Sequence, residues 1–358
     1  MSWVDSESEV CCENAEVFVQ SLTSLAVQFA NQSDTQSLRF LYRGVPDSGH
    51  RLIPTALRTE VEHPQMYKQL WDIADSRGRP AAASDRDKES AQRRAELTVI
   101  QHFYQYAERA GLSLPVVSDA NIRQELLTGR GTILDMAAFG TLLSHRGTGV
   151  AVWPPTELLP IIGLAQHYGL PTRLLDWSFS PYVSAYFAST GAMGRLTNGD
   201  DPNSLFCVWA TIANIFESYG QYDSTASLGG KLHVDVFPAR LVQPATADNP
   251  NLSAQQGVFT VVSGNEKIEN DTVTDRRDLP TVMSEFTQDS EKQSPGMSAP
   301  IFLRLQLPIK QAPSLVHYLH TLGYSANRIY SGFSGAASAV QERALLYQVR
   351  VSDKDKKT

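Results

Sequence analysis

One segment near the middle of the chain, from Leu164 to Ala188, constrains the fold more than any other. It reads LAQHYGLPTRLLDWSFSPYVSAYFA. A helical pattern of apolar residues leads into it and stops at Gly169, because a glycine readily takes the left-handed conformation that ends a helix. A short strand over 172–177 follows, and the Ser-Pro pair that begins at Ser180 is typical of a new helix start. The segment therefore predicts helix, turn, strand and helix in close succession.

The remaining sequence predicts further helices and strands. Helical spacing predicts helices over 14–30, over 95–110 with an end at Gly111, around 133–143, over 156–168 and over 314–322. Alternating or continuous apolar runs predict strands over 40–43, 205–212, 252–264, 301–307 and 325–330. A last element is expected near 336–349. A linker is expected over 78–88, and a long mobile insertion over 265–300, where the sequence is polar with little periodicity.

The length of 358 residues allows one elaborated domain or two, and the net charge of −7 narrows the class of protein. A general nucleic-acid binder needs a basic surface, which this charge disfavours, whereas an enzyme with a locally positive cleft stays open. Cys11, Cys12 and Cys207 are too few for a disulfide framework and lack metal-ligand spacing. Without a leader or a membrane-spanning run in the sequence, we expect a cytoplasmic protein with no membrane partner.

Arg43 stands at the end of the first predicted strand, on the face opposite Tyr42, and we expect Gly44 to break that strand. An arginine beside a glycine is well placed to meet an anion, because the glycine lets a ligand approach the backbone and the guanidinium binds phosphate bidentately. The alternative is a surface ion pair, which the isolated sequence favours.

Four stretches of the sequence together look like the FRG domain family. They are YRG at Tyr42 to Gly44 with LIPTALR behind it, QHYGLPTRLLDWS at Gln166 to Ser178 with YFA at Tyr186 to Ala188, AQQGVF at Ala254 to Phe259, and the segment around Leu319 to Ile329. The resemblance covers most of the chain from Phe40 to about Leu346. It implies a domain over 39–350, preceded by a helical segment over 1–38 and followed by a solvated tail over 351–358.

The order of these motifs is also similar, more loosely, to that of ADP-ribosyltransferases of the Arg-Ser-Glu type. This similarity implies an α+β fold with a split, mostly antiparallel sheet and helical additions. It also implies that NAD is the substrate, that Arg43 orients NAD through its phosphates and ribose, and that Ser178 is the hydroxyl of the second motif. Gln256 stands where those enzymes have the catalytic glutamate. The remaining residues expected to line the NAD site are Tyr42, Gly44, Gln166, Thr172 and Arg173.

The glutamine in the third motif leaves the source of negative charge open. Breaking the bond between nicotinamide and ribose develops an oxocarbenium-like centre, which a carboxylate stabilises and an amide does not. Asp176 is the first candidate carboxylate, with a structural role, capping a turn or pairing with Arg173, as the alternative. Glu342 is the second, and for it a solvated helix face is the favoured interpretation.

His167 has two interpretations, and its place between Gln166 and Tyr168 beside a glycine turn favours the functional one. It either stacks on a ring or transfers a proton near neutral pH, which would make it catalytic, or it is a satisfied core histidine at a helix end. Trp177 is expected in the core. Tyr42 packs either under the nucleotide or within the sheet, and Arg173 either locks the motif or touches phosphate.

The resemblance leads us to expect an ADP-ribosyltransferase-like toxin or anti-phage defence effector that modifies RNA or protein. Proteins of this type imply a restraining partner such as an antitoxin, and the insertion over 265–300 is where order on binding is expected. The alternative is a catalytically silent nucleotide-binding or interaction module, because the third-motif glutamate is missing.

Overall fold

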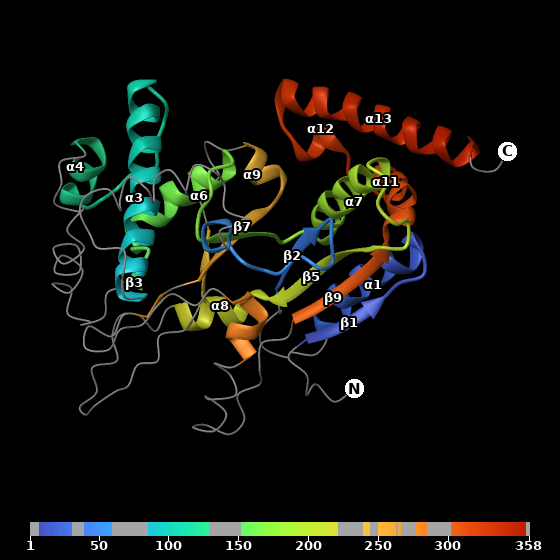
Figure 1. The fold of residues 1–358 in the computed structure, drawn as a ribbon, viewed down its shortest axis with the longest axis horizontal. Helices are drawn as coiled ribbons and strands as arrows, with labels where there is room; N and C mark the ends of the chain where they lie inside the picture. Colours follow the sequence, from blue (N-terminus) through green and yellow to red (C-terminus); the bar gives the residue numbers. More distant parts are fainter. Residues whose placement is uncertain are drawn as a thin grey trace.

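The computed structural model describes residues 7–30, 39–58, 85–128, 152–220, 239–243, 250–262, 264–265, 277–284 and 302–355. Its centre is a seven-stranded sheet with the strand order β1-β9-β5-β2-β4-β7-β6 (Figure 1). The strands are β1 (Glu7–Cys11), β2 (Phe40–Val45), β4 (Leu174–Ser178), β5 (Leu205–Ile212), β6 (Ala239–Val242), β7 (Gly257–Val262) and β9 (Phe302–Pro308). Only β1 and β9 pair in parallel; the other neighbours are antiparallel. A two-stranded sheet joins β3 (Val152–Trp153) to β8 (Gly264–Asn265).

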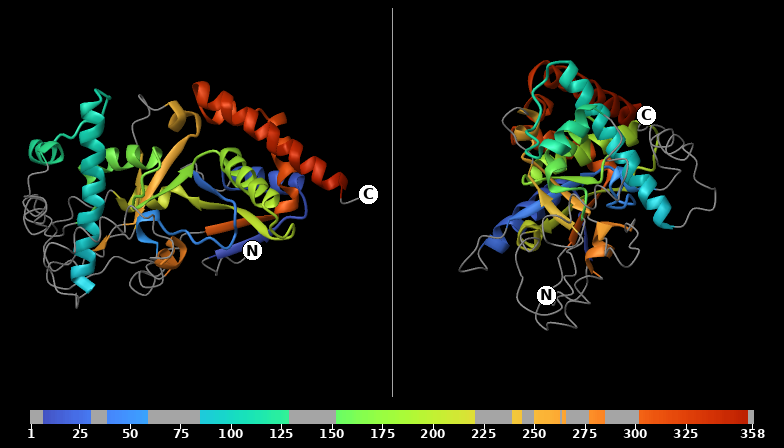
Figure 2. Two further views of the ribbon diagram at one scale, coloured as in Figure 1. Left: turned by 45° about the horizontal axis from the view of Figure 1, so that its top comes forward. Right: turned by 90° about the vertical axis from the view of Figure 1, so that its left-hand side faces the viewer.

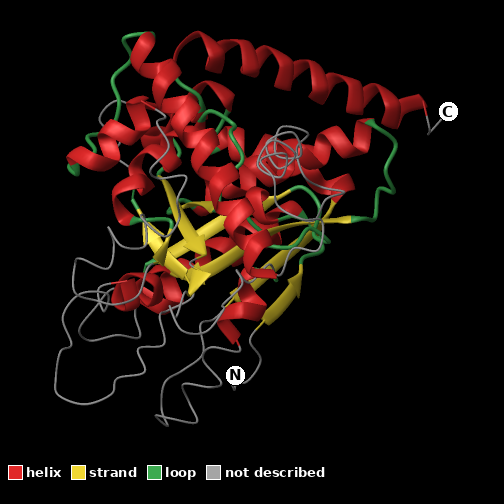
Figure 3. Cartoon of the chain, turned by 60° about the vertical axis from the view of Figure 1, so that its left-hand side comes forward, coloured by secondary structure: helices red, strands yellow, loops and turns green. Residues whose placement is uncertain are grey.

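Helices surround the sheet, as the cartoon in Figure 3 shows. They are α1 (Ala15–Ala30), α3 (Asp85–Arg109), α4 (Ala120–Thr128), α6 (Leu159–His167), α7 (Pro181–Thr197), α8 (Ala213–Gly220), α9 (Pro250–Ala254), α11 (Ala312–Thr321), α12 (Ala326–Ile329) and α13 (Gly332–Asp355), with 3-10 turns at Thr55–Leu57, Thr156–Leu158 and Ile309–Gln311. One core cluster joins the sheet to α1, α7, α11 and α12. Another joins it to α8 and to the helical residues 279–284. A third core lies between α3, α6 and the β4–β7 half of the sheet.

The sheet is split between β2 and β4. These two strands are joined at one register pair, Tyr42 with Ser178, whereas β2 is paired with β5 along its whole length from Phe40 to Val45. Strand β4 is likewise paired with β7 from Leu174 to Ser178. The described residues therefore form a mixed helix and sheet protein with a mostly antiparallel sheet, and this part of the predicted fold class is confirmed.

The described N-terminal residues form part of the seven-stranded sheet and its core. Strand β1 forms an edge of the sheet, and Phe18 and Leu22 of α1 are fully buried in the core. The ring of Phe18 lies 6.1 Å from that of Phe206 in β5. The described part of the first 38 residues is thus built into the predicted domain, and β1 was not predicted at all.

Most predicted elements are confirmed, and their ends obey simple chemistry. Helices α3, α6 and α11 end before Gly111, Gly169 and Gly323, all of which have a positive φ. Helix α7 begins as expected, with the Ser180 side chain accepting a hydrogen bond from the Val183 amide. The predicted helix around 133–143 and residues 78–84 of the predicted linker lie outside the described residues. The prediction is wrong for residues 85–88 of that linker, which belong to α3.

Several predicted elements are wrong. Residues 326–329 form helix α12 where a strand was expected, and the strand predicted from 252 begins only at Gly257 because α9 precedes it. Gly44 does not break β2, which continues to Val45. Within the predicted mobile insertion, residues 279–284 are helical and fully bury Leu279 and Met283. Helix α13 continues to Asp355, into the predicted tail.

Candidate functional site

Arg43 and Asp176 meet at the split in the sheet. Arg43 comes from β2, and its Nη1 donates a 2.7 Å hydrogen bond to the backbone carbonyl of Asp176 in β4. The same guanidinium forms an ion pair with the Asp176 carboxylate, whose side chain is 63% exposed while that of Arg43 is 17% exposed. An arginine therefore bridges the two strands beyond the point where their ladder stops, and leaves an accessible carboxylate beside it.

The charge state of Asp176 follows from this pairing. Desolvation by the surrounding protein raises the pKa of its carboxyl, but the Arg43 guanidinium, through its charge and hydrogen bond, outweighs that effect. A backbone hydrogen bond to the carboxylate and the charge of Arg58 lower the pKa further, and the four effects together hold it below its ordinary value. Asp176 is an ionised carboxylate at neutral pH, flanked by two cations.

The side chains of Gln166 and Thr172 form hydrogen bonds with the backbone of β4 at the edge that has no neighbouring strand. The Gln166 amide donates to the Leu174 carbonyl at 3.1 Å, and the Thr172 hydroxyl accepts from the Leu174 amide at 3.1 Å. The Thr172 hydroxyl also donates to the Gln166 side-chain oxygen. Because backbone polar groups at a strand edge need partners, these two side chains replace the missing neighbour strand. Their observed contacts are within the motif itself.

Ser178 ties the end of β4 to the entry of β7. Its hydroxyl donates to the Gln255 carbonyl at 2.7 Å and accepts from the Ser180 amide at 2.9 Å, and the residue is buried. Gln256 lies next to this contact, since its carbonyl accepts from the Phe179 amide at 3.1 Å. The Gln256 backbone has a φ of 49°, and its side chain is exposed at the mouth of β7. The second and third motifs are therefore brought together.

Tyr42 and Gly44 have packing roles in this structure. Tyr42 is buried in the core, where desolvation, with a smaller effect of Tyr182, raises its pKa to about 12. Its hydroxyl has no hydrogen-bond partner among the described residues. A Cβ on Gly44 would lie 1.9 Å from the Ser184 carbonyl oxygen, so the glycine admits the backbone of α7, not a ligand, to this side of β2.

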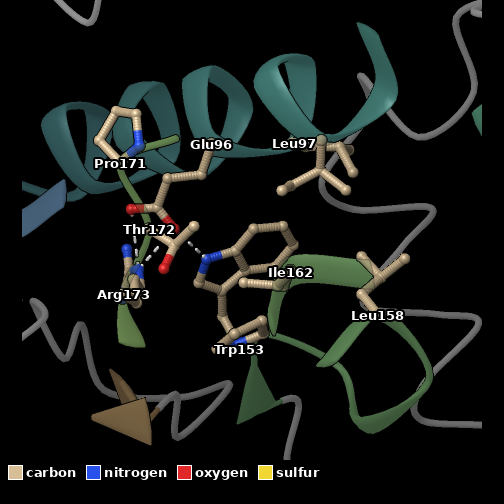
Figure 4. Close-up of a pocket in the computed structure, with 10 residues that line it drawn as sticks. Glu96, Leu97, Trp153, Leu158, Ile162, Pro171, Thr172 and Arg173 are labelled. Atoms are coloured by element: carbon tan, nitrogen blue, oxygen red, sulfur yellow. Dashed lines mark hydrogen bonds and ion pairs between the residues drawn. The ribbon is translucent and has the colours of Figure 1, made fainter. Parts of the chain in front are cut away.

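Arg173 lies in a buried network with α3. Its Nε donates to the Glu96 carboxylate at 2.6 and 2.8 Å, and Trp153 donates its indole N–H to the same carboxylate at 2.8 Å. Figure 4 shows Arg173 and Trp153 both directed at Glu96. The adjoining cavity has a volume of about 10 Å³, the space of one water molecule. Arg173 pairs with Glu96 and not, as one interpretation expected, with Asp176.

His167 stands in the last turn of α6, half-buried, with its ring edge-on to that of Tyr168 at 5.4 Å. Desolvation lowers the pKa of its imidazole, so the ring is neutral at pH 7. A neutral imidazole can accept a proton. No hydrogen bond or ion pair recorded among the described residues joins His167 to Arg43 or Asp176.

Glu342 does not lie on a solvated helix face, as was expected. It is buried, accepts hydrogen bonds from the Tyr186 hydroxyl at 2.7 Å and the Ala326 amide at 3.2 Å, and contacts His320. These contacts fasten α13 to α7, α11 and α12. The carboxylate is thereby committed to holding the C-terminal helix, which leaves Asp176 as the accessible acid of the two.

Two residues of this region were not predicted. Glu96 was not predicted as a partner of Arg173 because it lies far from the motif in sequence. The one sign of a buried polar contact was a polar pair, Gln92 and Glu96, on the apolar face of α3. Arg58 ends the LIPTALR stretch and acts on Asp176 only through space. Sequence spacing gives no sign of that proximity.

Comparison with known proteins supports the family and nothing finer. The model of the FRG domain family matches residues 144–194, which include α6, β4 and the first part of α7. No curated protein and no solved structure matches the chain. Among the described residues, no cluster of histidine, cysteine and acidic side chains could hold a metal ion, and no helix is long and apolar enough to cross a membrane.

Proposed function

We propose that this chain, a member of the FRG domain family through residues 144–194, acts in the cytoplasm as an NAD-dependent ADP-ribosyltransferase-like enzyme that modifies RNA or protein. The observation that carries the proposal is the pairing of Arg43 with the ionised, accessible Asp176 at the split between β2 and β4. A guanidinium that could bind phosphate and an accessible carboxylate in one place are the two charges that NAD cleavage needs.

The chemistry assigns a role to each charge. The Arg43 guanidinium would bind the pyrophosphate of NAD, for which its planar fork is suited. Cleavage breaks the bond from nicotinamide to ribose, and nicotinamide leaves with the bonding electron pair. Positive charge then develops at the anomeric carbon, where the Asp176 carboxylate would stabilise it. An acceptor nucleophile forms the new bond to that carbon and loses its proton.

The other motif residues would support this site. The exposed Gln256 amide can hydrogen-bond a ribose hydroxyl without adding charge. Ser178 holds Gln256 in place through the Gln255 carbonyl, and Gln166 and Thr172 hold β4. Neutral His167 would accept the proton of the nucleophile if the acceptor reaches it.

The biological setting is part of the proposal. The family resemblance supports a toxin or anti-phage defence effector, held in check by an antitoxin or another restraining protein. A base amine of RNA and a protein side chain are both competent nucleophiles at the anomeric carbon. The acidic net charge of −7 gives a small preference for protein.

The test is label transfer by the purified full-length chain. NAD labelled in its adenylate moiety is incubated with total cell RNA and, separately, with total cell protein. We expect label in one of the two pools, and we expect Arg43→Ala to lower transfer by about a hundredfold, since it removes the phosphate anchor.

The matched control is Arg39→Ala, which removes another partly exposed, acid-paired arginine, bonded to Glu217 next to the same strand. This variant should keep transfer within about twofold. Transfer that is equal in the Arg43 and Arg39 variants would contradict the proposed position of NAD.

A catalytically silent nucleotide-binding module is the second candidate, favoured by the amide of Gln256 in place of a carboxylate. It predicts calorimetric binding of NAD that Arg43→Ala abolishes, with neither label transfer nor nicotinamide release by the native chain. Nicotinamide release above the uncatalysed rate would reject this second candidate.

A further inference from the structure

The C-terminal helix α13 has a buried inner stripe, which is small and apolar except for Glu342, and an outer stripe of small and apolar residues on the opposite face. The inner stripe contains Gly335, Ala339, Glu342, Leu346 and Val349. Gly335, Glu342 and Val349 are buried, and the other two pack against the core. A Cβ on Gly335 would lie 1.9 Å from the Tyr330 carbonyl oxygen, which shows how closely this face approaches the domain. The inner stripe, together with Leu345, attaches the helix to the domain.

The described part of the chain leaves the outer stripe uncovered. It contains Phe333, Ala337, Val340, Ala344 and Tyr347, all exposed. The three large side chains, Phe333, Val340 and Tyr347, are 96%, 71% and 70% exposed. Figures 1 and 2 show α13 along the periphery of the molecule, with free space on its outer side.

The spacing of the outer stripe is that of a coiled-coil seam. Its members are separated by four, three, four and three residues, which are the successive core positions of a heptad. Single exposed apolar residues are ordinary on protein surfaces. A helix that is apolar on two opposite faces, by contrast, is one that is buried on both.

We infer that the outer stripe pairs α13 with the same helix of a second copy of this chain, as an antiparallel two-stranded coil centred on Val340. The stripe is self-complementary about this residue: a two-fold rotation exchanges Phe333 with Tyr347 and brings Ala337 of one copy within one residue of the level of Ala344 of the other. Aromatic rings then meet at both ends of the seam, with close-approaching alanines in between. The inference uses no residue of the proposed NAD site.

The charges along the helix favour this direction of pairing. Between residues 333 and 349 the charged residues are Glu342, which is buried, and Arg343, which is exposed. In the antiparallel coil Arg343 lies opposite residue 337 of the other copy, so the two Arg343 residues are about 9 Å apart along the axis. That separation is close to the Debye length at physiological salt. A parallel coil would place both arginines at the same level.

The area of the seam fits a weak but specific dimer. Each exposed aromatic side chain contributes on the order of 150–250 Å². Four of these, together with two valines and four alanines, amount to about 1,000 Å² of buried surface, at the lower limit of specific interfaces. We therefore expect a dimer that dissociates in the micromolar range.

Sedimentation velocity of the full-length chain from about 1 to 200 μM tests the inference. We expect a concentration-dependent dimer, and we expect Val340→Asp to raise the dissociation constant at least about thirtyfold by placing two facing carboxylates in the seam. Val116→Asp is the matched control, since Val116 is 88% exposed in the loop after α3, and it should leave the dimer unchanged. Circular dichroism checks that both variants fold. A native chain that stays monomeric, or a Val340→Asp chain that dimerises as the native one does, would overturn the inference.

Disulfide trapping tests the direction of pairing. In a Cys11→Ser background, which removes the exposed native thiol, Val340→Cys should form a covalent dimer on mild oxidation. Phe333→Cys should cross-link to Tyr347→Cys when the two variants are mixed, whereas Tyr347→Cys should not cross-link to itself. Self-linking of Tyr347→Cys together with no mixed product would show a parallel coil and contradict the proposed geometry.

Discussion

Asp176 is the one exposed residue of β4, whose other four residues are all buried. Leu175 and Trp177 on either side face the core, so the alternation of a strand turns the carboxylate to the opposite face. There the Arg43 guanidinium holds it ionised. This pairing offsets the desolvation of the carboxyl, and the exposed side chain stays available to a ligand.

Gly44 provides a sharp test of local packing. Gly44→Ala should lower the free energy of unfolding by about 3 kcal/mol or more, because its methyl group would overlap the Ser184 carbonyl oxygen. Chemical denaturation measures the change. Gly49→Ala is the control, where the nearest atom is the Asp47 carboxylate oxygen at 3.3 Å. Equal stabilities of the two variants would contradict the close approach of α7 to β2.

His167 makes stability depend on pH. Because its pKa is lowered in the folded chain, the unfolded chain takes up this proton first as the pH falls below about 6.5. The contribution of the neutral ring to the free energy of unfolding is thus present above pH 6.5, and it is lost as the pH falls through the folded-state pKa. Denaturation of the native chain and of His167→Gln should give stabilities whose difference changes between pH 7.5 and 5. A difference that is constant over this range would show that His167 is not desolvated.

The identity of a residue predicted its place at a helix end better than it predicted its contacts with other elements. Ser180 and Gly169 behave as their chemistry dictates, because a helix cap and a left-handed turn are local events. Glu342 was expected in solvent and is buried, since its partners Tyr186 and His320 come from other helices. No spacing along one helix reveals such a partner.

At the scale of elements, β4 is a strand with one incomplete edge. Beyond the pair between Tyr42 and Ser178, its carbonyls are bonded by side chains: Arg43 to Asp176 and Gln166 to Leu174. Thr172 takes the Leu174 amide in the same way. Many polar residues of the motif are thus explained by the hydrogen bonds that the incomplete edge of β4 needs. Only the polar residues without such a role require a ligand to explain them.

The Glu96–Arg173 pair should make α3 a structural support of this motif. Glu96→Leu leaves the buried Arg173 guanidinium without its carboxylate, so we expect a loss of about 3–5 kcal/mol in the free energy of unfolding. Glu108→Ala, in the exposed last turn of the same helix, should change stability by less than about 0.5 kcal/mol. Chemical denaturation compares the two. A Glu96→Leu chain as stable as the native one would show that the pair contributes nothing.

Elements with a clear period were predicted well and short ones were not. Strand β9 alternates strictly and β5 is continuously apolar, and both were found. Residues 326–329 contain few periodic positions, and their helix is fixed by packing against α13 and by the Glu342 contact with the Ala326 amide. Tertiary contacts decide such segments.

At the scale of the whole molecule, three motifs far apart in sequence converge on the split of one sheet. Strand β2 brings Arg43, β4 brings Asp176 and Ser178, and the entry of β7 brings Gln256. The sequence predicted this convergence only through the family resemblance, because strand order is a property of the folded chain. It could not predict which carboxylate faces Arg43.

In the proposed reaction, Asp176 takes the place of the third-motif carboxylate. The direct measurement is the rate of nicotinamide release from NAD by the native chain, Asp176→Asn and Asp176→Glu. We predict that Asp176→Asn lowers the rate by about a hundredfold or more, because it keeps the shape and removes the charge, whereas Asp176→Glu stays within about tenfold of the native rate. Release by Asp176→Asn at the native rate would contradict the account.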